Sequence, residues 1–284
     1  MKNIVWLASY PKSGNTWFRM FLANYLANVE FPLLFSDITD ASIASSAVDF
    51  EEQIGLNPFE LTPDEVDLYR PELYRILSKE NSDEIQYKKV HDAYTRNQNN
   101  VPLFSTEISR AAVYFVRNPL DVCVSYANHS ASNVTNTANF IQSKEATVAG
   151  YKKGQLRQIL LSWQDHYFSW SKQEEIPVYI VRYEDMKQAP MESFGNIIRF
   201  LGLEYEEKRL YRSIVNSDFK LLKQMEKDIG FKEKMQKCES FFWKGTIGNY
   251  KNYLSEEQIQ SIINANFEAM LELGYIDTNG KLTI

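Results

Sequence analysis

A polar turn near the start of the chain carries residue types that bind phosphate or sulfate. The sequence YPKSGNTW at residues 10–17 follows a short apolar run and precedes apolar positions at helical spacing. Lys12 supplies a positive charge, Ser13 and Thr16 supply hydroxyl donors, and Gly14 lets a ligand approach the backbone closely. Backbone N–H groups and the helix dipole favour an anion at such a turn. We therefore predict a local anion site at residues 10–17.

The position of the lysine relative to the glycine distinguishes this turn from the Walker A motif. Walker A places its lysine after the second glycine, whereas Lys12 precedes Gly14. A P-loop kinase or NTPase of related fold is the alternative function, and it would also need an aspartate after a strand to hold Mg²⁺. A nucleotide-binding protein without activity is a further alternative. Lys12 and His91, a histidine whose imidazole can take up a proton near neutral pH, argue against this second alternative, because a protein that only binds a nucleotide requires no base.

A second motif, RNPLDVCVS at residues 117–125, follows the apolar run 111–116. The Arg117 guanidinium can form paired hydrogen bonds with a phosphate dianion. Ser125 lies on the helix that this motif begins, and its hydroxyl adds a donor. The pattern of strand, turn and helix is thus repeated, which is typical of a parallel sheet covered by helices.

Together these motifs resemble the sulfotransferases that use 3′-phosphoadenosine 5′-phosphosulfate (PAPS), of the cytosolic type that includes bacterial enzymes acting on small molecules. In that family the first motif binds the 5′-phosphosulfate and the second binds the 3′-phosphate. VRYEDM at residues 181–186 and SDFK at 217–220 resemble the segments beside the adenine. FWKGTIGNYK at 242–251 resembles a family segment that contacts the 3′-phosphate. The resemblance spans residues 4–251.

The resemblance implies a set of side chains that contact the cofactor, PAPS or its product adenosine 3′,5′-bisphosphate (PAP). They are Lys12, Ser13, Gly14, Asn15, Thr16, Trp17, Arg117, Ser125, Tyr183, Ser217, Phe219, Trp243, Lys244 and Gly245. Trp243 stands where the family has an arginine, so one cation of the 3′-phosphate site is missing. Asn249 and Tyr250 stand where the family has Asp and Trp.

The three histidines are the candidates for proton transfer, because imidazole titrates near neutral pH. KVH at residues 89–91 resembles the family's KTH segment, which implies that His91 is the general base. His166, in SWQDH, resembles a histidine that lines the acceptor pocket. His129 follows the Ser125 helix and matches no motif. Adjacent residues seldom face one another, so we do not expect Asp92 to orient His91.

The reaction implied is in-line transfer of a sulfuryl group from PAPS to a hydroxyl or amine of a small molecule. Such a transfer depends mainly on positioning and on stabilising charge. Lys12 would stabilise the departing phosphate, with Lys89 nearby as a third catalytic residue beside His91. The sequence does not identify the acceptor; a natural product is one candidate. We expect no metal, since the acidic residues form no cluster and lysines supply the positive charge.

The expected fold is α/β, a P-loop-like parallel sheet flanked by helices, in a single domain over residues 1–284. Short apolar runs predict strands at 4–8, 111–116 and 177–182, and periodic segments predict helices at 155–171, 190–201, 206–215 and 255–273. Residues 130–154 are polar, small and poorly periodic. They indicate a mobile surface segment, either a lid or a solvated loop.

Composition limits the range of partners. The chain has 284 residues and a net charge of −6, which disfavours broad binding to nucleic acid or anionic polysaccharide. No stretch of about 20 apolar residues predicts a membrane span, so we expect a cytoplasmic protein and not a membrane-anchored carbohydrate sulfotransferase. Cys123 and Cys238 lie in no metal or disulfide pattern. The oligomeric state is left open by the sequence.

Overall fold

The computed structural model describes all residues except 1, 38–41, 81, 150–153, 236–237 and 284. Its contacts divide the chain into two compact units. Unit 1 comprises residues 1–10, 40–114 and 144–180, and unit 2 comprises residues 11–39, 115–143 and 181–284. Every predicted cofactor-contacting residue belongs to unit 2, whereas Lys89, His91 and His166 belong to unit 1. The prediction of a single domain over the whole chain stays a prediction.

Within the described part of the chain, the central sheet has four strands in the order β2-β1-β3-β6. They are β1 (Ile4–Ser9), β2 (Gln86–Val90), β3 (Ser109–Val116) and β6 (Val178–Arg182). β1 and β2 pair in parallel, with Leu7 opposite Lys89. Every residue of β1 is buried, as its unbroken apolar pattern predicts. The sequence analysis missed β2, because the charged residues of QYKKV conceal its strand pattern.

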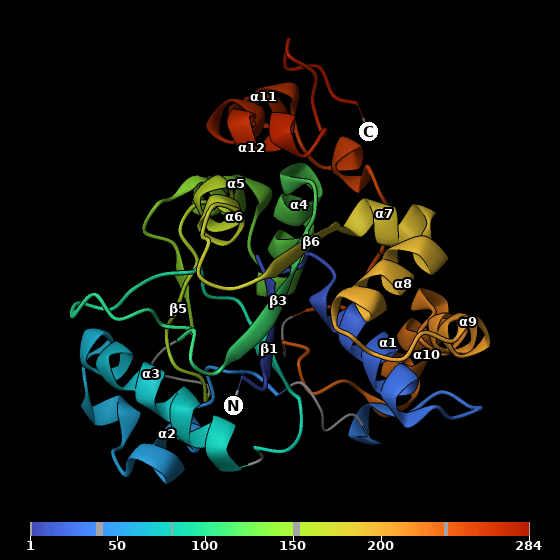
Figure 1. Ribbon diagram of the computed structural model, residues 1–284. Helices are drawn as coiled ribbons and strands as arrows, with labels where there is room; N and C mark the ends of the chain where they lie inside the picture. Colours follow the sequence, from blue (N-terminus) through green and yellow to red (C-terminus); the bar gives the residue numbers. More distant parts are fainter. Residues whose placement is uncertain (1, 38–41, 81, 150–153, 236–237, 284) are drawn as a thin grey trace. The chain divides into compact units, whose positions relative to one another are not determined.

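The helices of unit 1 are α2 (Ala47–Ile54), α3 (Pro63–Glu80) and α6 (Trp163–Ser171), and Figure 1 shows α2 beside α3. The predicted helix 155–171 is wrong in its first part, because α6 begins only at Trp163. Ser162 caps α6 by accepting a hydrogen bond from the Asp165 N–H. Residues Gln158–Ile159 instead form β5, which pairs antiparallel with β4 (Thr147–Val148).

Unit 2 is mainly helical. Its helices are α1 (Asn15–Ala27), α4 (Pro119–Ser130), α5 (Val134–Gln142), α7 (Tyr183–Gln188), α8 (Pro190–Phe200), α9 (Glu207–Asn216), α10 (Phe219–Ile229), α11 (Glu256–Ala265) and α12 (Phe267–Glu272). The predicted helices at 190–201 and 206–215 are confirmed. The one predicted at 255–273 is interrupted at Asn266, whose side-chain amide donates to the Ile262 carbonyl oxygen.

The segment 130–154 is more regular than its sequence indicates. Residues 134–142 form α5, which begins where Asn133 accepts a hydrogen bond from the Asn136 N–H. The expectation of an irregular loop is therefore wrong for these residues. Residues 150–153 lie outside the described residues, and the lid stays a prediction. Among the described residues, no helix is both long and apolar enough to cross a bilayer.

Candidate active site

The predicted anion-binding turn connects β1 to α1 and has an unusual backbone. Lys12 adopts a φ of 72° and Gly14 a φ of 101°, both in the left-handed region. Gly14 is the N-cap of α1, and no side chain caps the helix there. Ser13 is fully buried, and its Oγ has no hydrogen-bond partner among the described residues. The start of α1 therefore offers an unsatisfied hydroxyl donor at Ser13, as a bound anion requires.

Arg117 links this turn to the segment that carries Lys244 and Gly245. Its Nη1 donates to the Lys12 carbonyl oxygen at 3.3 Å and its Nη2 to the Thr246 carbonyl oxygen at 3.0 Å. The side chain is buried, and its Nε has no partner within the described chain. A buried guanidinium with an unsatisfied N–H fits a phosphate ligand, because leaving that donor unpaired costs free energy.

Aromatic rings pack against two glycines of unit 2. A Cβ at Gly14 would lie 2.8 Å from the Tyr183 ring, and one at Gly245 would lie 2.5 Å from the Phe219 ring. The Tyr183 hydroxyl donates to the Gly245 carbonyl oxygen at 3.0 Å. Trp17 meets Tyr183 edge to face, with 5.9 Å between ring centroids. The structure thus brings together five of the residues predicted to hold the nucleotide: Gly14, Trp17, Tyr183, Phe219 and Gly245.

The other predicted cofactor residues of unit 2 differ in their surroundings. The Ser217 hydroxyl donates to the Ser213 carbonyl oxygen at 2.8 Å, while the Ser217 carbonyl oxygen accepts from Trp17 Nε1 at 2.9 Å. Lys244 is exposed, and its Nζ lies 5.4 Å from the centroid of the Trp243 ring. Asn15 and Thr16 are buried in the first turn of α1, and Ser125 is half-buried on α4. Their roles toward the cofactor stay predictions.

The sequence analysis missed Asp121, which holds the loop that follows Gly245. Its carboxylate accepts hydrogen bonds from the backbone N–H of Gly248 at 2.8 Å and of Tyr250 at 3.0 Å. Asp121 lies within the RNPLDVCVS motif, so its position four residues after Arg117 was a visible signal. Ser125 is one turn further along the same face of α4.

A second carboxylate, that of Glu226 on α10, holds the chain just before Trp243. It accepts from the backbone N–H of Phe241 at 2.6 Å and of Phe242 at 2.9 Å, and from the Ser240 hydroxyl at 2.8 Å. The Phe241 ring in turn contacts the Lys12 ammonium, whose Nζ lies 3.9 Å from the ring centroid. Nothing in the sequence pattern distinguishes Glu226 from the exposed acids of the chain.

A third buried carboxylate, Glu184, supports the start of α4. It accepts from the Asn118 N–H at 3.1 Å and from the Tyr275 hydroxyl at 2.8 Å. Burial raises the pKa of Glu184. The Asn118 side chain caps α4 by accepting from the Leu120 N–H. The residues next to Arg117 in the motif therefore fix the backbone that carries it.

His91 lies in unit 1, directly after β2, and is half-buried. Its Nδ1 is 2.8 Å from the Ser9 carbonyl oxygen and 3.3 Å from the Ser9 hydroxyl. A carbonyl oxygen only accepts hydrogen bonds, so Nδ1 must carry the proton in the neutral ring. Nε2 is then the nitrogen with a lone pair. Lys89, two residues earlier, lies in β2 and is buried.

His166 on α6 is fully buried, and both of its ring nitrogens are hydrogen-bonded within unit 1. Nε2 is 3.0 Å from the His91 carbonyl oxygen, and Nδ1 is 2.8 Å from the Tyr114 hydroxyl. Burial lowers the pKa of His166 to about 4, so the ring is neutral at pH 7. The predicted role of His166 in an acceptor pocket stays a prediction. In the structure, its ring hydrogen-bonds to the His91 carbonyl oxygen and to the Tyr114 hydroxyl in the interior of unit 1.

The family model for the sulfotransferase domain matches residues 2–274 of this chain. The chain belongs to the sulfotransferase family. Mouse sulfotransferase 1B1 is 30% identical over 156 residues, a match that covers 52% of this chain and 50% of the mouse protein. Cytosolic sulfotransferase 14 of Arabidopsis thaliana is 25% identical over 270 residues, covering 90% of this chain and 72% of that protein. Flavonol 3-sulfotransferase of Flaveria bidentis is 25% identical, covering 92% and 79%.

Solved structures support the fold of this sulfotransferase family member. Mouse sulfotransferase SULT7A1, complexed with PAP, has a TM-score of 0.60 at 19% identity and covers 95% of this chain and 84% of its own. Retinol dehydratase, in a complex with retinol and PAP, has a TM-score of 0.63 at 19% identity, covering 95% and 81%. The predictions of a sulfotransferase and of a P-loop-like α/β fold are confirmed, and the kinase alternative is not favoured.

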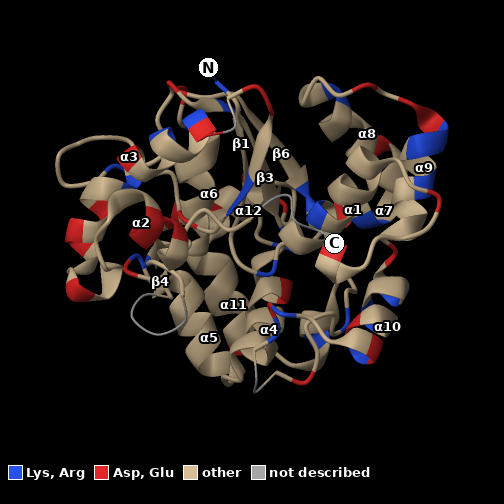
Figure 2. Ribbon diagram, turned by 90° about the horizontal axis from the view of Figure 1, so that it is seen from below, with Lys and Arg blue, Asp and Glu red and all other residues tan. Residues whose placement is uncertain are grey.

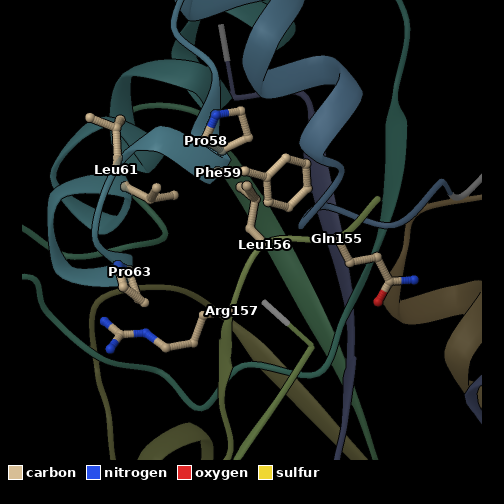
Figure 3. A pocket seen from close by; sticks show the side chains of 8 residues that line it. Pro58, Phe59, Leu61, Pro63, Gln155, Leu156 and Arg157 are labelled. Carbon is tan, nitrogen blue, oxygen red and sulfur yellow. The ribbon is translucent and has the colours of Figure 1, made fainter. Parts of the chain in front are cut away.

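A small cavity in unit 1 of the sulfotransferase is bounded by the segment around Phe59, by Val66 of α3 and by the residues around Leu156 (Figure 3). Its volume is about 20 Å³, room for roughly one water molecule. Arg157 at its edge is ion-paired with Asp64 and Asp67. None of the predicted site residues lines this cavity, and it is too small for an organic acceptor.

Basic side chains of the sulfotransferase gather along α9 (Figure 2). Two of them bind the end of α1: Arg209 Nε donates to the Tyr25 carbonyl oxygen at 2.6 Å, and Arg212 donates to the Asn28 side chain. Cations near a helix C-terminus stabilise it, which gives this face a structural role. Among the described residues, no three His, Cys, Asp or Glu side chains are grouped as a metal site would need.

Proposed function

We propose that this protein transfers the sulfuryl group of PAPS to a hydroxyl or amine of a small molecule, with His91 as the general base. The family match supports the reaction class. The observation that carries the nucleotide site is the pair of buried, unsatisfied donors in unit 2, Ser13 Oγ and Arg117 Nε. Both belong to motifs that face anionic groups in the family, and both would be satisfied by phosphate or sulfate oxygens.

The nucleotide would be held by three groups of residues in unit 2. The turn with Lys12 and Ser13 and the start of α1 up to Trp17 would bind the 5′-phosphosulfate. Arg117, Ser125, Lys244 and the backbone of Gly245 would bind the 3′-phosphate, and Tyr183, Ser217 and Phe219 would surround the adenine. Trp243 would contribute its ring in place of the family's arginine. The positive charge of Lys12 would stabilise the phosphate that leaves.

The proton transfer follows from the tautomer of His91. Because Nδ1 donates to the Ser9 carbonyl oxygen, the lone pair of Nε2 would accept the proton of the acceptor hydroxyl. The acceptor oxygen forms its bond to sulfur as the bond from sulfur to the 5′-phosphate oxygen breaks, and PAP leaves with that electron pair. PAPS supplies the activated sulfuryl group. Lys89 would add positive charge near the leaving group.

The acceptor class rests on the named relatives. Flavonol 3-sulfotransferase and luciferin sulfotransferase are named for small-molecule acceptors. We extend this class to the present chain, without choosing among phenols, alcohols and amines. Several relatives are named as cytosolic, which supports a cytoplasmic location.

The nucleotide site is tested by calorimetric titration of PAP, AMP and ATP into the full-length protein. PAP should bind far more tightly than AMP or ATP, because Arg117 and Lys244 recognise the 3′-phosphate. Arg117→Gln should weaken PAP binding by about 1.5–3 kcal/mol, the value of a hydrogen bond to a charged group, and leave the weak AMP binding nearly unchanged.

Arg199→Gln is the matched control, since Arg199 is an exposed arginine of the same unit that belongs to no predicted site. It should leave the affinity for PAP unchanged. Equal affinity of the wild-type protein for PAP and ATP would refute the proposed 3′-phosphate site. A screen of phenol, alcohol and amine acceptors with radiolabelled PAPS then tests the reaction itself, and no labelled product with any class would refute it.

A further inference from the structure

The backbone that carries His91 is held by one face of helix α6. His166 Nε2 donates to the His91 carbonyl oxygen at 3.0 Å, and Trp170 Nε1 donates to the Asp92 carbonyl oxygen at 3.0 Å. Between them, the Ser169 hydroxyl accepts from the Tyr94 N–H at 2.9 Å. Positions 166, 169 and 170 share one face of a helix, so this face of α6 contacts residues 91, 92 and 94 of the chain after β2.

The tautomer of His166 is set by these contacts. The His91 carbonyl oxygen can only accept, so Nε2 of His166 carries its proton and Nδ1 accepts from the Tyr114 hydroxyl at 2.8 Å. His166 is fully buried, and a buried hydrogen-bonding group left without its partner is destabilising. The two histidines therefore hold opposite tautomers, with Nε2 protonated in His166 and Nδ1 protonated in His91.

A buried ion pair fixes the next residue. Arg70 of α3 binds the Asp92 carboxylate through two parallel contacts, Nη1 to Oδ1 at 3.0 Å and Nη2 to Oδ2 at 2.7 Å. The Ile159 N–H also donates to Oδ1 at 3.0 Å. Both charged side chains are fully buried, so the pair is rigid and costly to break. Asp92 thus fixes the backbone next to His91, and its carboxylate is bound to Arg70.

We propose that His166 is a positioning residue for the general base: its bond to the His91 carbonyl oxygen, supported by Trp170 and by the Arg70–Asp92 pair, keeps the His91 ring on Ser9 with Nε2 unprotonated. This inference rests on the proposed function only in treating His91 as the base. The chain positions His91 by its backbone, where many enzymes orient a histidine through a carboxylate on the ring. A small backbone shift would be enough to weaken the bond from Nδ1 to Ser9.

The test compares two amides at position 166. His166→Gln reaches as far as Nε2 and keeps a donor for the His91 carbonyl oxygen. His166→Asn is too short for that bond and keeps the contact with Tyr114. Because the chain has three histidines, imidazole nitrogen NMR of the full-length protein can be assigned with single variants. At pH 8 an ordinary imidazole is neutral, so the spectra report tautomers.

We expect His91 to show protonated Nδ1 in the wild-type protein and in His166→Gln, and a mixture of tautomers in His166→Asn. The variant His129→Gln carries the same substitution in unit 2 and should leave the His91 signals unchanged. Identical His91 signals in the wild type, His166→Gln and His166→Asn would overturn the proposal. If His166→Asn does not fold, Trp170→Phe keeps an aromatic ring and removes its N–H donor; it should shift His91 in the same direction, and an unchanged spectrum would again overturn it.

Kinetics separate positioning from substrate binding. With radiolabelled PAPS and p-nitrophenol as the acceptor probe, His166→Asn should lower kcat about 10- to 100-fold, as expected for a misplaced catalytic group. The KM for p-nitrophenol and the affinity for PAP should stay within about twofold, and His166→Gln should restore most of kcat. A rise in acceptor KM with unchanged kcat and unchanged His91 signals would make His166 a pocket residue and overturn the proposal. Full activity of His91→Ala would refute His91 as the base, whereas the tautomer spectra still decide whether His166 positions it.

Discussion

Gly245→Ala tests whether the packing of Phe219 and Tyr183 against Gly245 forms part of the nucleotide site. Gly245 has a φ of 63°, and a methyl group there would lie 2.5 Å from the Phe219 ring. The left-handed backbone alone costs alanine about 1–2 kcal/mol. The methyl group must also displace Phe219 or move the backbone, and the second change breaks the bond from the Tyr183 hydroxyl to the Gly245 carbonyl oxygen. Such a bond contributes about 0.5–1.5 kcal/mol, so PAP should bind about 2- to 13-fold more weakly.

Gly55→Ala is the control for backbone strain. Gly55 has a φ of 75°, and a Cβ there would meet no atom within 4 Å. Urea unfolding should show that both variants lose stability, with the larger loss in Gly245→Ala. Calorimetric titration with PAP should show weaker binding in Gly245→Ala alone. Adding Phe219→Leu should relieve part of the stability loss, because leucine frees the space of the ring edge. Unchanged PAP affinity in Gly245→Ala would refute the packing of Phe219 and Tyr183 as part of the nucleotide site.

Three further predictions concern the base, the missing arginine and acid stability. His91→Ala should lower turnover of p-nitrophenol about 10²–10⁴-fold and leave PAP affinity nearly unchanged; near-full turnover would refute the role of His91. Trp243→Arg should tighten PAP binding by up to about 1–3 kcal/mol in calorimetry, because it adds a charged donor. The Trp243 ring centroid lies 5.4 Å from that of Tyr253. Equal or weaker binding of PAP would show that the Trp243 ring already contributes to the site. Because the pKa of His166 is lowered to about 4, the unfolded chain binds a proton between pH 6.5 and 4 that the folded chain does not, and stability should fall by roughly 3 kcal/mol over that range. His166→Gln should remove this part of the pH dependence of urea unfolding, and an unchanged slope would contradict the burial of a neutral ring.

Elements whose signals are local could be predicted from the amino-acid sequence. The apolar run before residue 10, the polar turn and the helical spacing after it predict β1, the anion-binding turn and α1, because strand and helix periods and turn chemistry are properties of neighbouring residues. The roles of Arg117 and Tyr183 at a nucleotide are implied instead by the resemblance to the sulfotransferases, and the structure brings Arg117, Tyr183 and Gly245 together in unit 2. The charged residues of β2 mask the alternating pattern of a strand, so the sequence pattern did not predict that strand.

How the predicted groups are held depends on contacts between residues that are distant in the sequence. Asp92 is bound by Arg70, 22 residues away, and His166 bonds the carbonyl oxygen of His91 across 75 residues. Glu226 binds backbone N–H groups 15 and 16 residues later, with no motif to mark it. Buried carboxylates and rings must satisfy their hydrogen bonds with whatever the fold places beside them, and that neighbour is set by packing between distant segments. The motifs and the family that they resemble therefore predict which groups do chemistry, whereas the tautomers and orientation of these groups depend on partners that only the folded chain supplies.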